Sequence, residues 1–257
     1  MKRLLVIFAL LASISSYDAS AWGRHGHDAI AYIAELNLNP RTKEIVENYL
    51  DGKSIVYVAS WPDQIRFIHE YAHIYPSHSH IALLDENLKV LPRGASDALN
   101  MSMDIIESLS DGKYTQLPDS LVAEKIKILV HFIGDIHCPV HHSVRGRKES
   151  FRVISNGQKM SFHHYIDSMP SIIHDWSYME YGYQLSRFSP AKVQDVTSGD
   201  LPSWVEKTAR MALPVWDMVE PDGELGKPYE YEVMPLFDEI IASAGYRLAF
   251  VLNSIFK

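Results

Sequence analysis

One short segment, residues 131–141, gathers the side chains of this 257-residue chain that are best suited to chemistry. Four of its residues are of that kind: His131, Asp135, His137 and His141. Residues four apart share one face of a helix, so His131 and Asp135 would point to the same side. Pro139 should end that helix just before the last histidine. A helix end and the loop after it can therefore offer several nitrogen and oxygen ligands to a metal ion.

The same spacing recurs downstream at His163 and Asp167. Upstream, Asp63 is a further candidate ligand, and Arg66 lies about one helical turn later, where it could contact a phosphate. Three more histidines crowd one segment: His73, His78 and His80. Each residue alone has a plainer explanation, such as a hydrogen-bonded core histidine or, for Asp63, a helix cap. Their joint occurrence favours a site with more than one metal ion.

The first 21 residues have the pattern of a secretory signal peptide. Two basic residues precede a short apolar stretch, residues 4–11, and an Ala-x-Ala sequence ends at Ala21. That stretch falls short of the ~20 residues that span a bilayer, which disfavours a membrane anchor. We therefore expect cleavage after Ala21, a secreted or periplasmic protein, and one mature domain over residues 22–257.

Cleavage after Ala21 would make Trp22 the mature N-terminus. Its free amine and its own carbonyl oxygen could chelate a metal ion in a five-membered ring, with His27 close enough to join them. Cys138 is the only cysteine, so an internal disulfide is excluded, and we expect it to be a small buried residue. The candidate ligands are therefore nitrogen and oxygen atoms.

The overall charge limits the kind of partner that the surface can bind. A net charge of -8 argues against a broad basic surface for nucleic acid. It leaves open an enzyme whose positive charge is concentrated in bound metal. A local basic loop could place charge near a phosphate, although a solvated loop is the simpler explanation for its residues: Arg145, Arg147, Lys148 and Arg152.

Apolar spacing predicts one mainly helical domain with at most a small β-hairpin. The expected helices cover residues 28–36; 98–109, capped by Ser96; 121–133, capped by Asp119 or Ser120; 205–211, starting at Ser203; and 236–256, with Pro235 as first residue. The last of these is apolar enough to be a central core element. Asn156 and Gly157 favour a tight type I′ turn between strands at residues 151–154 and 159–162.

Together these motifs resemble the zinc-dependent single-strand nucleases of the S1/P1 type, within the superfamily that also contains zinc phospholipases C. The matching residues run through the mature chain: Trp22, Gly23 and His27; Trp61, Asp63 and Arg66; His131, Asp135, His137, Pro139 and His141; Phe162, His163 and Asp167; and residues 244–249 with Leu252 and Asn253. The central motif is highly specific, whereas the opening Trp-Gly alone would be weak. The resemblance implies an all-helical domain of the phospholipase C/nuclease type.

The resemblance also implies a trinuclear zinc cluster. Its ligand sets would be Asp63, His78, His131 and Asp135 for one ion; the Trp22 amine and carbonyl, His27 and a shared Asp135 for the second; and His141, His163 and Asp167 for the third. His80 is close enough to replace His78 as the ligand. Ser79 stands where the family often has a base-stacking aromatic residue, and Ile166 where a Trp is usual. These departures leave the base preference open.

The implied activity is an endonuclease that hydrolyses single-stranded DNA and RNA to 5′-nucleotides, with 3′-nucleotidase activity as well. Asp63 would orient the attacking hydroxide and Arg66 would stabilise charge in the transition state. We expect a monomer without stable membrane association. The alternatives are a zinc phospholipase C or a non-catalytic exported zinc-binding protein. The short gap from Trp22 to His27 and the acid Asp167, where those lipases have Glu, favour the nuclease.

Overall fold

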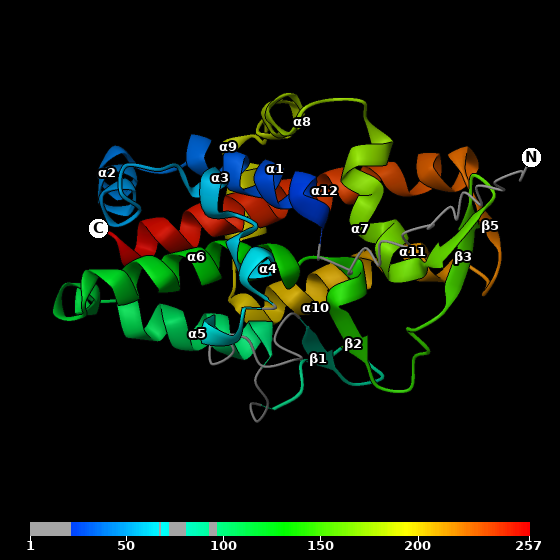
Figure 1. Ribbon diagram of the computed structural model, residues 1–257, viewed down its shortest axis with the longest axis horizontal. Coiled ribbons are helices and arrows are strands. Elements are labelled where there is room, and N and C mark those ends of the chain that lie inside the picture. Colours follow the sequence, from blue (N-terminus) through cyan, green and yellow to red (C-terminus); the bar gives the residue numbers. More distant parts are fainter. Residues whose placement is uncertain (1–21, 67, 72–80, 93–96) are drawn as a thin grey trace, which may run out of the picture.

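The computed structural model describes residues 22–66, 68–71, 81–92 and 97–257, which form mostly helices (Figure 1). The α-helices are α1 (Gly23–Leu36), α2 (Pro40–Tyr49), α3 (Ile55–Val58), α4 (Trp61–Ile65), α5 (Ala98–Leu109), α6 (Asp119–Asp135), α7 (Phe162–Ile173), α8 (Tyr178–Leu185), α9 (Pro190–Thr197), α10 (Leu201–Met211), α11 (Leu213–Asp217) and α12 (Lys227–Ile255). Short 3₁₀ turns cover His69–Tyr71, Lys113–Gln116 and Pro139–His141. The expected mainly helical fold is confirmed, and the expected signal peptide lies outside the described residues.

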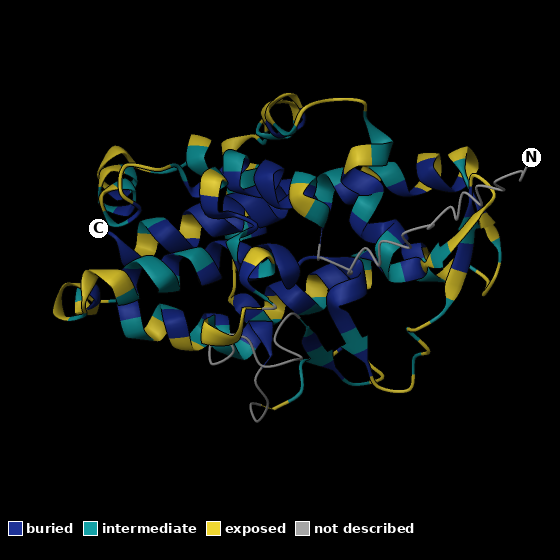
Figure 2. Cartoon of the chain, in the orientation of Figure 1, coloured by how far each residue is buried: buried dark blue, intermediate teal, exposed yellow. Residues whose placement is uncertain are grey.

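Helix α12 forms the centre of the core, as its apolar sequence predicts. Helices α1, α5, α6, α7, α8 and α9 all contact it. In Figure 2 the buried surface concentrates where α1, α6 and α12 lie together. Apolar side chains on α12 recur at helical spacing and are almost completely buried: Phe237, Ile240, Ile241, Ala244, Leu248 and Leu252. Burial of apolar surface contributes ~25 cal/mol per Å² to the free energy of folding. The buried face of α12 therefore stabilises the packing of the helices around it.

Two helix starts differ from the predicted caps. At α5 the cap is Asp97, whose carboxylate accepts a hydrogen bond from the Asn100 backbone N–H. The predicted cap Ser96 lies outside the described residues. Helix α6 includes Asp119 as its first residue and has no side-chain cap, so the prediction of Asp119 or Ser120 as the cap was wrong.

Helices α10 and α12 begin earlier than their sequence patterns predict. Asp200 and Ser203 cap each other's backbone reciprocally, so α10 starts two residues before Ser203. Helix α12 starts at Lys227, and Pro235 lies inside it rather than at its start. An interior proline costs about 3 kcal/mol. Burial of residues on both sides of Pro235, such as Val233 and Phe237, offsets this cost.

The predicted hairpin is present as β3 (Arg152–Ser155) paired antiparallel with β4 (Gln158–Ser161). Asn156 and Gly157 both have positive φ, 50° and 73°, as a type I′ turn requires. The structure adds short strands that the sequence analysis did not predict: β5 (Glu224–Leu225) parallel to β3, and β1 (Ala82–Leu84) parallel to β2 (His142–Val144). Among the described helices, no segment has both the length and the apolar character needed to cross a membrane.

Gly245 allows α1 and α12 to approach closely. A Cβ atom at this position would lie 2.5 Å from the Ile33 Cβ and 3.0 Å from the Ile30 carbonyl oxygen. We expect Gly245→Ala to lower the free energy of unfolding by roughly 1–2 kcal/mol, because overpacking exceeds the gain in helix propensity. Urea denaturation measures this. Ser254→Ala, on the exposed face of α12, is the control and should change stability by less than about 0.5 kcal/mol. Equal midpoints for both variants would contradict the prediction.

Candidate metal centre

Helices α1, α4 and α6 bring four of the predicted ligands into one cluster, which we call cluster A: His27, Asp63, His131 and Asp135. The imidazoles of His27 and His131 stack with ring centres 4.0 Å apart, and the Asp135 carboxylate contacts the Nε2 atom of each, with Oδ1 3.3 Å from His27 and Oδ2 3.4 Å from His131. Nε2 of His131 is also 3.6 Å from an oxygen of Asp63. The ligand atoms of His27, Asp63 and His131 all lie within 4.8 Å of one another, which is close enough to share a metal ion.

The start of α1 is fixed against the end of α6 by Trp22. Its indole is completely buried, donates a hydrogen bond to the Gly134 carbonyl at 3.0 Å, and contacts Phe237 edge to face. Gly134 also leaves room for His27, because a Cβ atom there would lie 2.8 Å from the His27 Nδ1. The same anchoring therefore positions His27 and the Trp22 backbone at the site.

Backbone carbonyls orient the histidines around cluster A. Nδ1 of His131 lies 2.8 Å from the Ala59 carbonyl oxygen, so Nε2 faces the carboxylates. A histidine that donates one N–H to a carbonyl in this way is held in position to bind metal through the other nitrogen. His137 and His142 are also buried; His137 contacts the carbonyl of Ile133 on α6, and His142 contacts the carbonyl of Ile136, which follows α6.

The remaining predicted ligands form cluster B: His141, His163 and Asp167. The Nε2 atoms of His141 and His163 are 2.9 Å apart, and Nε2 of His163 is 3.4 Å from an Asp167 oxygen. Ser161 begins α7 by accepting a hydrogen bond from the His164 backbone N–H, which fixes the helical turn that carries His163 and Asp167. Residues four apart on this helix thus meet, as their spacing predicts.

Cys138 is buried, as predicted, but it also lies next to cluster B. Its Sγ is 3.8 Å from Asp167 Oδ1, and it lies within 4.8 Å of the ligand atoms of His141 and Asp167. The Trp22 backbone N–H interacts with both the Cys138 thiol and the Asp167 carboxylate. The nitrogen predicted to bind metal after cleavage therefore lies beside cluster B. Cys138 and Asp167 are far apart in the sequence, so no spacing pattern predicts their contact.

The electrostatics of the two clusters favour a bound cation. Burial lowers the pKa of His131, but the carboxylates of Asp135 and Asp63 outweigh burial and raise it to about 9. Burial raises the pKa of Asp167 well above its usual value, and the charges of Asp135 and Asp63 raise it further. Burial also acts to raise the pKa of Asp63, but the positive charge of His131 outweighs it and lowers that pKa. A divalent cation would replace the His131 proton and stabilise ionised Asp167.

The donor set fits a metal ion of the zinc type. Within the described part of the chain, Nε2 of His27 and Oδ2 of Asp167 are buried, and their polar contacts are the ion pairs at 3.3 and 3.4 Å, which lack good hydrogen-bond geometry. Buried polar atoms of this kind are costly unless something binds them. Imidazole nitrogens and carboxylate oxygens are ligands that zinc accepts.

Two predicted residues need separate mention. His78, with His80 as its alternative, lies in residues 72–80, outside the described residues. Arg66 follows Asp63 by three residues and caps the C-terminal end of α4, where it is partly buried.

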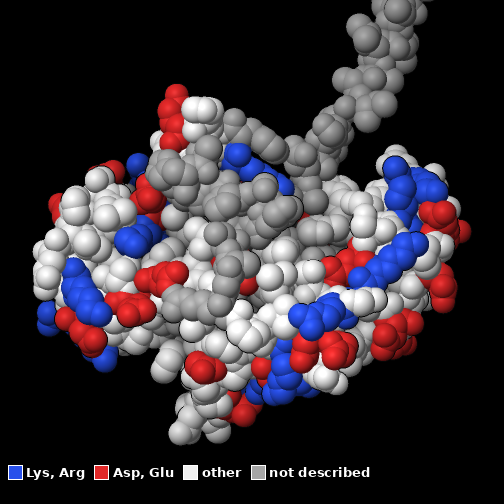
Figure 3. All heavy atoms as spheres, turned by 90° about the horizontal axis from the view of Figure 1, so that it is seen from below, with Lys and Arg blue, Asp and Glu red and all other residues white. Residues whose placement is uncertain are grey.

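In the basic loop, the Arg147 guanidinium stacks on the Trp216 ring at 3.9 Å and pairs with Glu149, so these contacts account for this arginine without a bound phosphate. On the face of the molecule seen in Figure 3, Lys and Arg side chains are interspersed with Asp and Glu rather than gathered in one broad patch.

A helical domain with two adjacent His/Asp clusters defines a metal-dependent enzyme of the phospholipase C/nuclease type. Residues 22–257 match the S1/P1 Nuclease family, and the chain belongs to that family. It is 27% identical to Endonuclease 4 of Arabidopsis thaliana, over 99% of this chain and 94% of the relative. It is 26% identical to Nuclease S1 of Aspergillus oryzae (99% and 98%) and 24% identical to Nuclease P1 of Penicillium citrinum (91% and 97%). The family match and the named nucleases show that the chain is a nuclease, a hydrolase acting on phosphodiester bonds, and favour this function over a phospholipase.

Zinc binding should release a proton from His131. A pKa of about 9 means that His131 is protonated near pH 7.5 in the metal-free protein, and a metal can bind its nitrogen only after that proton leaves. Calorimetry in buffers of different ionisation enthalpy counts the released protons. We expect His131→Gln to release about one proton fewer than the unsubstituted protein.

His142→Gln is the matched control for that measurement. Burial lowers the pKa of His142 to about 4, so this histidine is already neutral near pH 7.5 and its loss should leave the proton count unchanged. If His131→Gln and the unsubstituted protein released equal numbers of protons at pH 7.5, the assigned protonation of cluster A would be wrong.

Proposed function

We propose that this nuclease is an exported zinc-dependent endonuclease that hydrolyses single-stranded DNA and RNA to 5′-nucleotides and also acts on 3′-nucleotides. The observation that carries the proposal is the closeness of clusters A and B. Asp135 and Asp63 of cluster A raise the pKa of Asp167 in cluster B, so the two clusters share one electrostatic environment. Several cations in one site suit the cleavage of a phosphodiester, whose reaction accumulates negative charge.

The ligands of clusters A and B, together with a histidine outside the described residues, suit a trinuclear site. The proposed ligands are Asp63, His131, Asp135 and a histidine at 78 or 80 for one zinc; the Trp22 amine and carbonyl, His27 and Asp135 for the second; and His141, His163 and Asp167 for the third. Bound zinc supplies positive charge that acidifies water and offsets the charge of a phosphate. Removal of residues 1–21 frees the Trp22 amine, so export and assembly of the site are coupled in this proposal.

Asp63 and Arg66 act on the reacting groups in this proposal. The lowered pKa of Asp63 keeps its carboxylate ionised at neutral pH, so it can accept a hydrogen bond from the attacking water and orient it. Its side chain is 12% exposed, whereas that of Asp135 is fully buried, so Asp63 lies on the solvent side of cluster A. The Arg66 guanidinium would hold oxygens of the phosphate in the transition state.

Burial of the clusters supports a preference for single strands. His27, His131 and His141 are each at most 2% exposed, so a phosphate must enter a recess to reach them. A single strand can bend a phosphate into such a recess, whereas stacked base pairs hold it on the outside of a duplex. Because the chain has a net charge of -8, binding of a nucleic acid must depend on positively charged groups near the site rather than on attraction to the whole protein.

Loss of Arg66 should abolish most of the activity. We expect Arg66→Ala to lower kcat/KM for single-stranded DNA by about 10²–10³-fold, because a charge that stabilises the transition state is removed. Zinc content, measured on the same sample, should not change. Arg187→Ala, which removes an exposed arginine two residues after the end of α8, is the control and should retain activity. An active Arg66→Ala enzyme would refute this assignment, and hydrolysis of phosphatidylcholine in preference to DNA would refute the proposed substrate.

A further inference from the structure

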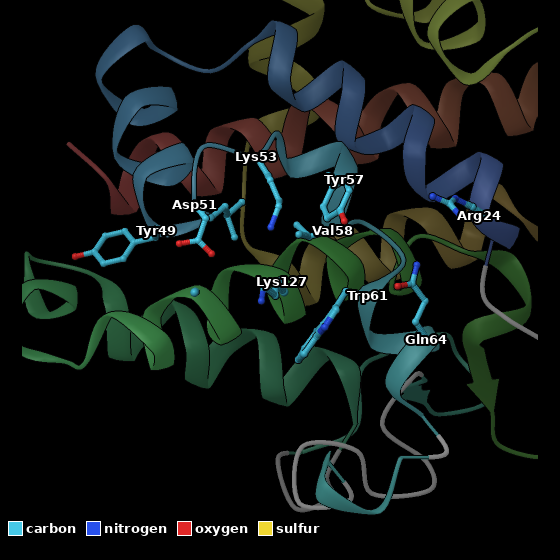
Figure 4. Close-up of a pocket in the computed structure, with 11 residues that line it drawn as sticks. Arg24, Tyr49, Asp51, Lys53, Tyr57, Val58, Trp61, Gln64 and Lys127 are labelled. Atoms are coloured by element: carbon cyan, nitrogen blue, oxygen red, sulfur yellow. The ribbon is translucent and has the colours of Figure 1, made fainter.

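A cavity of about 470 Å³ lies beside cluster A, between α1, α3, α4 and α6 (Figure 4). The side chains that matter for its chemistry are aromatic or cationic: Arg24, Lys53, Tyr57, Trp61 and Lys127. In Figure 4, Lys53, from the segment between α2 and α3, and Tyr57, on α3, extend toward Lys127 and Trp61. None of these residues belongs to the proposed ligand sets or to the catalytic pair Asp63 and Arg66.

The cavity adjoins cluster A because the same helices build both. On α6, Lys127 precedes His131 by four residues, so the two share one helix face. On α1, Arg24 precedes His27 by three residues. On α4, Trp61 lies two residues before Asp63. One helical turn covers about 5.4 Å, so the cavity begins roughly one nucleotide away from the ligands.

Aromatic rings and cations alternate in this cavity. Lys127 Nζ lies 4.9 Å from the centre of the Trp61 ring, and Lys53 Nζ lies 5.3 Å from the centre of the Tyr57 ring. Tyr57 is 67% exposed, although burial of an aromatic side chain is favourable. Its open ring face is available for stacking with a base, and the neighbouring ammonium groups suit phosphates.

The charge of the cavity is opposite to that of the whole chain. Its lining contains three cations, Arg24, Lys53 and Lys127, and one carboxylate, Asp51. Figure 4 shows Asp51 at the end near Tyr49, whereas Arg24 lies at the other end. A polyanion would therefore be attracted to the end of the cavity near Arg24, although the chain has a net charge of -8.

We propose that this cavity binds a nucleotide of the single strand one step beyond the two nucleosides that the scissile phosphate joins, with its base stacked on the exposed ring of Tyr57 and its phosphates beside Lys53, Lys127 and Arg24. The inference rests on the proposed function, because it assumes a polynucleotide substrate. It adds a subsite that mononucleotides and dinucleotides are too short to occupy together with the metal centre. The cavity thus makes the enzyme selective for longer strands.

Substrates of two lengths test this subsite. The quantity measured is the ratio of kcat/KM for a twelve-nucleotide oligothymidylate to kcat/KM for a thymidine dinucleotide, with the zinc-loaded protein. We expect Tyr57→Ala to lower this ratio about tenfold, since stacking on one aromatic ring is lost. We expect Lys53→Ala to reduce the slope of log(kcat/KM) against log salt for the longer strand by about 0.7, the effect of one phosphate contact on a single strand.

Matched controls come from helices α8 and α10, which do not line the cavity. Tyr183 on α8 is 58% exposed and has the Arg187 guanidinium 5.8 Å from its ring centre, so Tyr183→Ala removes a similar ring. Lys207→Ala removes an exposed lysine of α10 that pairs with Asp195. Both should leave the ratio and the salt slope unchanged.

The outcomes separate the two proposals. If the unsubstituted protein cleaves both substrates but Tyr57→Ala leaves the length ratio unchanged, or if Lys53→Ala leaves the salt slope unchanged, the subsite is refuted and the proposed function stands. If the unsubstituted protein cleaves neither substrate, the proposed function is refuted and the subsite with it.

Discussion

The buried carboxylate of Asp135 is the interaction on which the rest of the site depends. It is fully buried, contacts His27 on one side and His131 on the other, and lies close enough to Asp63 and Asp167 to shift their pKa values. So many carboxylates in one buried place require compensating positive charge. Although burial lowers the pKa of His131, these carboxylates raise it to about 9, so the imidazole can carry compensating charge at neutral pH, and a bound metal ion would take over that role. His27 lies on α1 and Asp135 on α6, so the two side chains meet only because these helices lie close together.

The fold provides that approach through a few specific contacts rather than through general packing. Gly245 lets α1 lie tightly on α12, Gly134 makes room for the His27 ring, and the buried Trp22 indole locks the start of α1 to the end of α6. These contacts join the core to the site, so a change in the core would move a ligand. In the proposed function the chain begins at Trp22, and this residue then has two roles, since its side chain anchors the helix while its backbone binds metal.

Much of the fold and most of cluster A and B could be predicted from the sequence. His131 and Asp135, like His163 and Asp167, are four residues apart on a helix, so each pair lies in contact in the structure as the spacing predicts. Asn156 and Gly157 form the predicted turn because both adopt positive φ. Other features depend on tertiary contacts that leave no local pattern. Examples are the continuation of α12 through Pro235, the approach of Cys138 to Asp167, and the cavity that holds Tyr57 and Lys127, whose residues come from separate helices. The caps at Asp97 and Asp200 were missed because several polar residues near each helix start are equally suitable.

The most direct test of the account is to compare the zinc content of two purified chains, one beginning at Trp22 and one that retains Ala21. The account predicts about three zinc ions per chain for the first and about two for the second, because an amide nitrogen cannot replace the free amine as a ligand. N-terminal sequencing of both samples establishes where each chain begins. Equal zinc content in the two chains would contradict the proposed role of the Trp22 backbone, and absence of tightly bound zinc from both would contradict the metal centre itself.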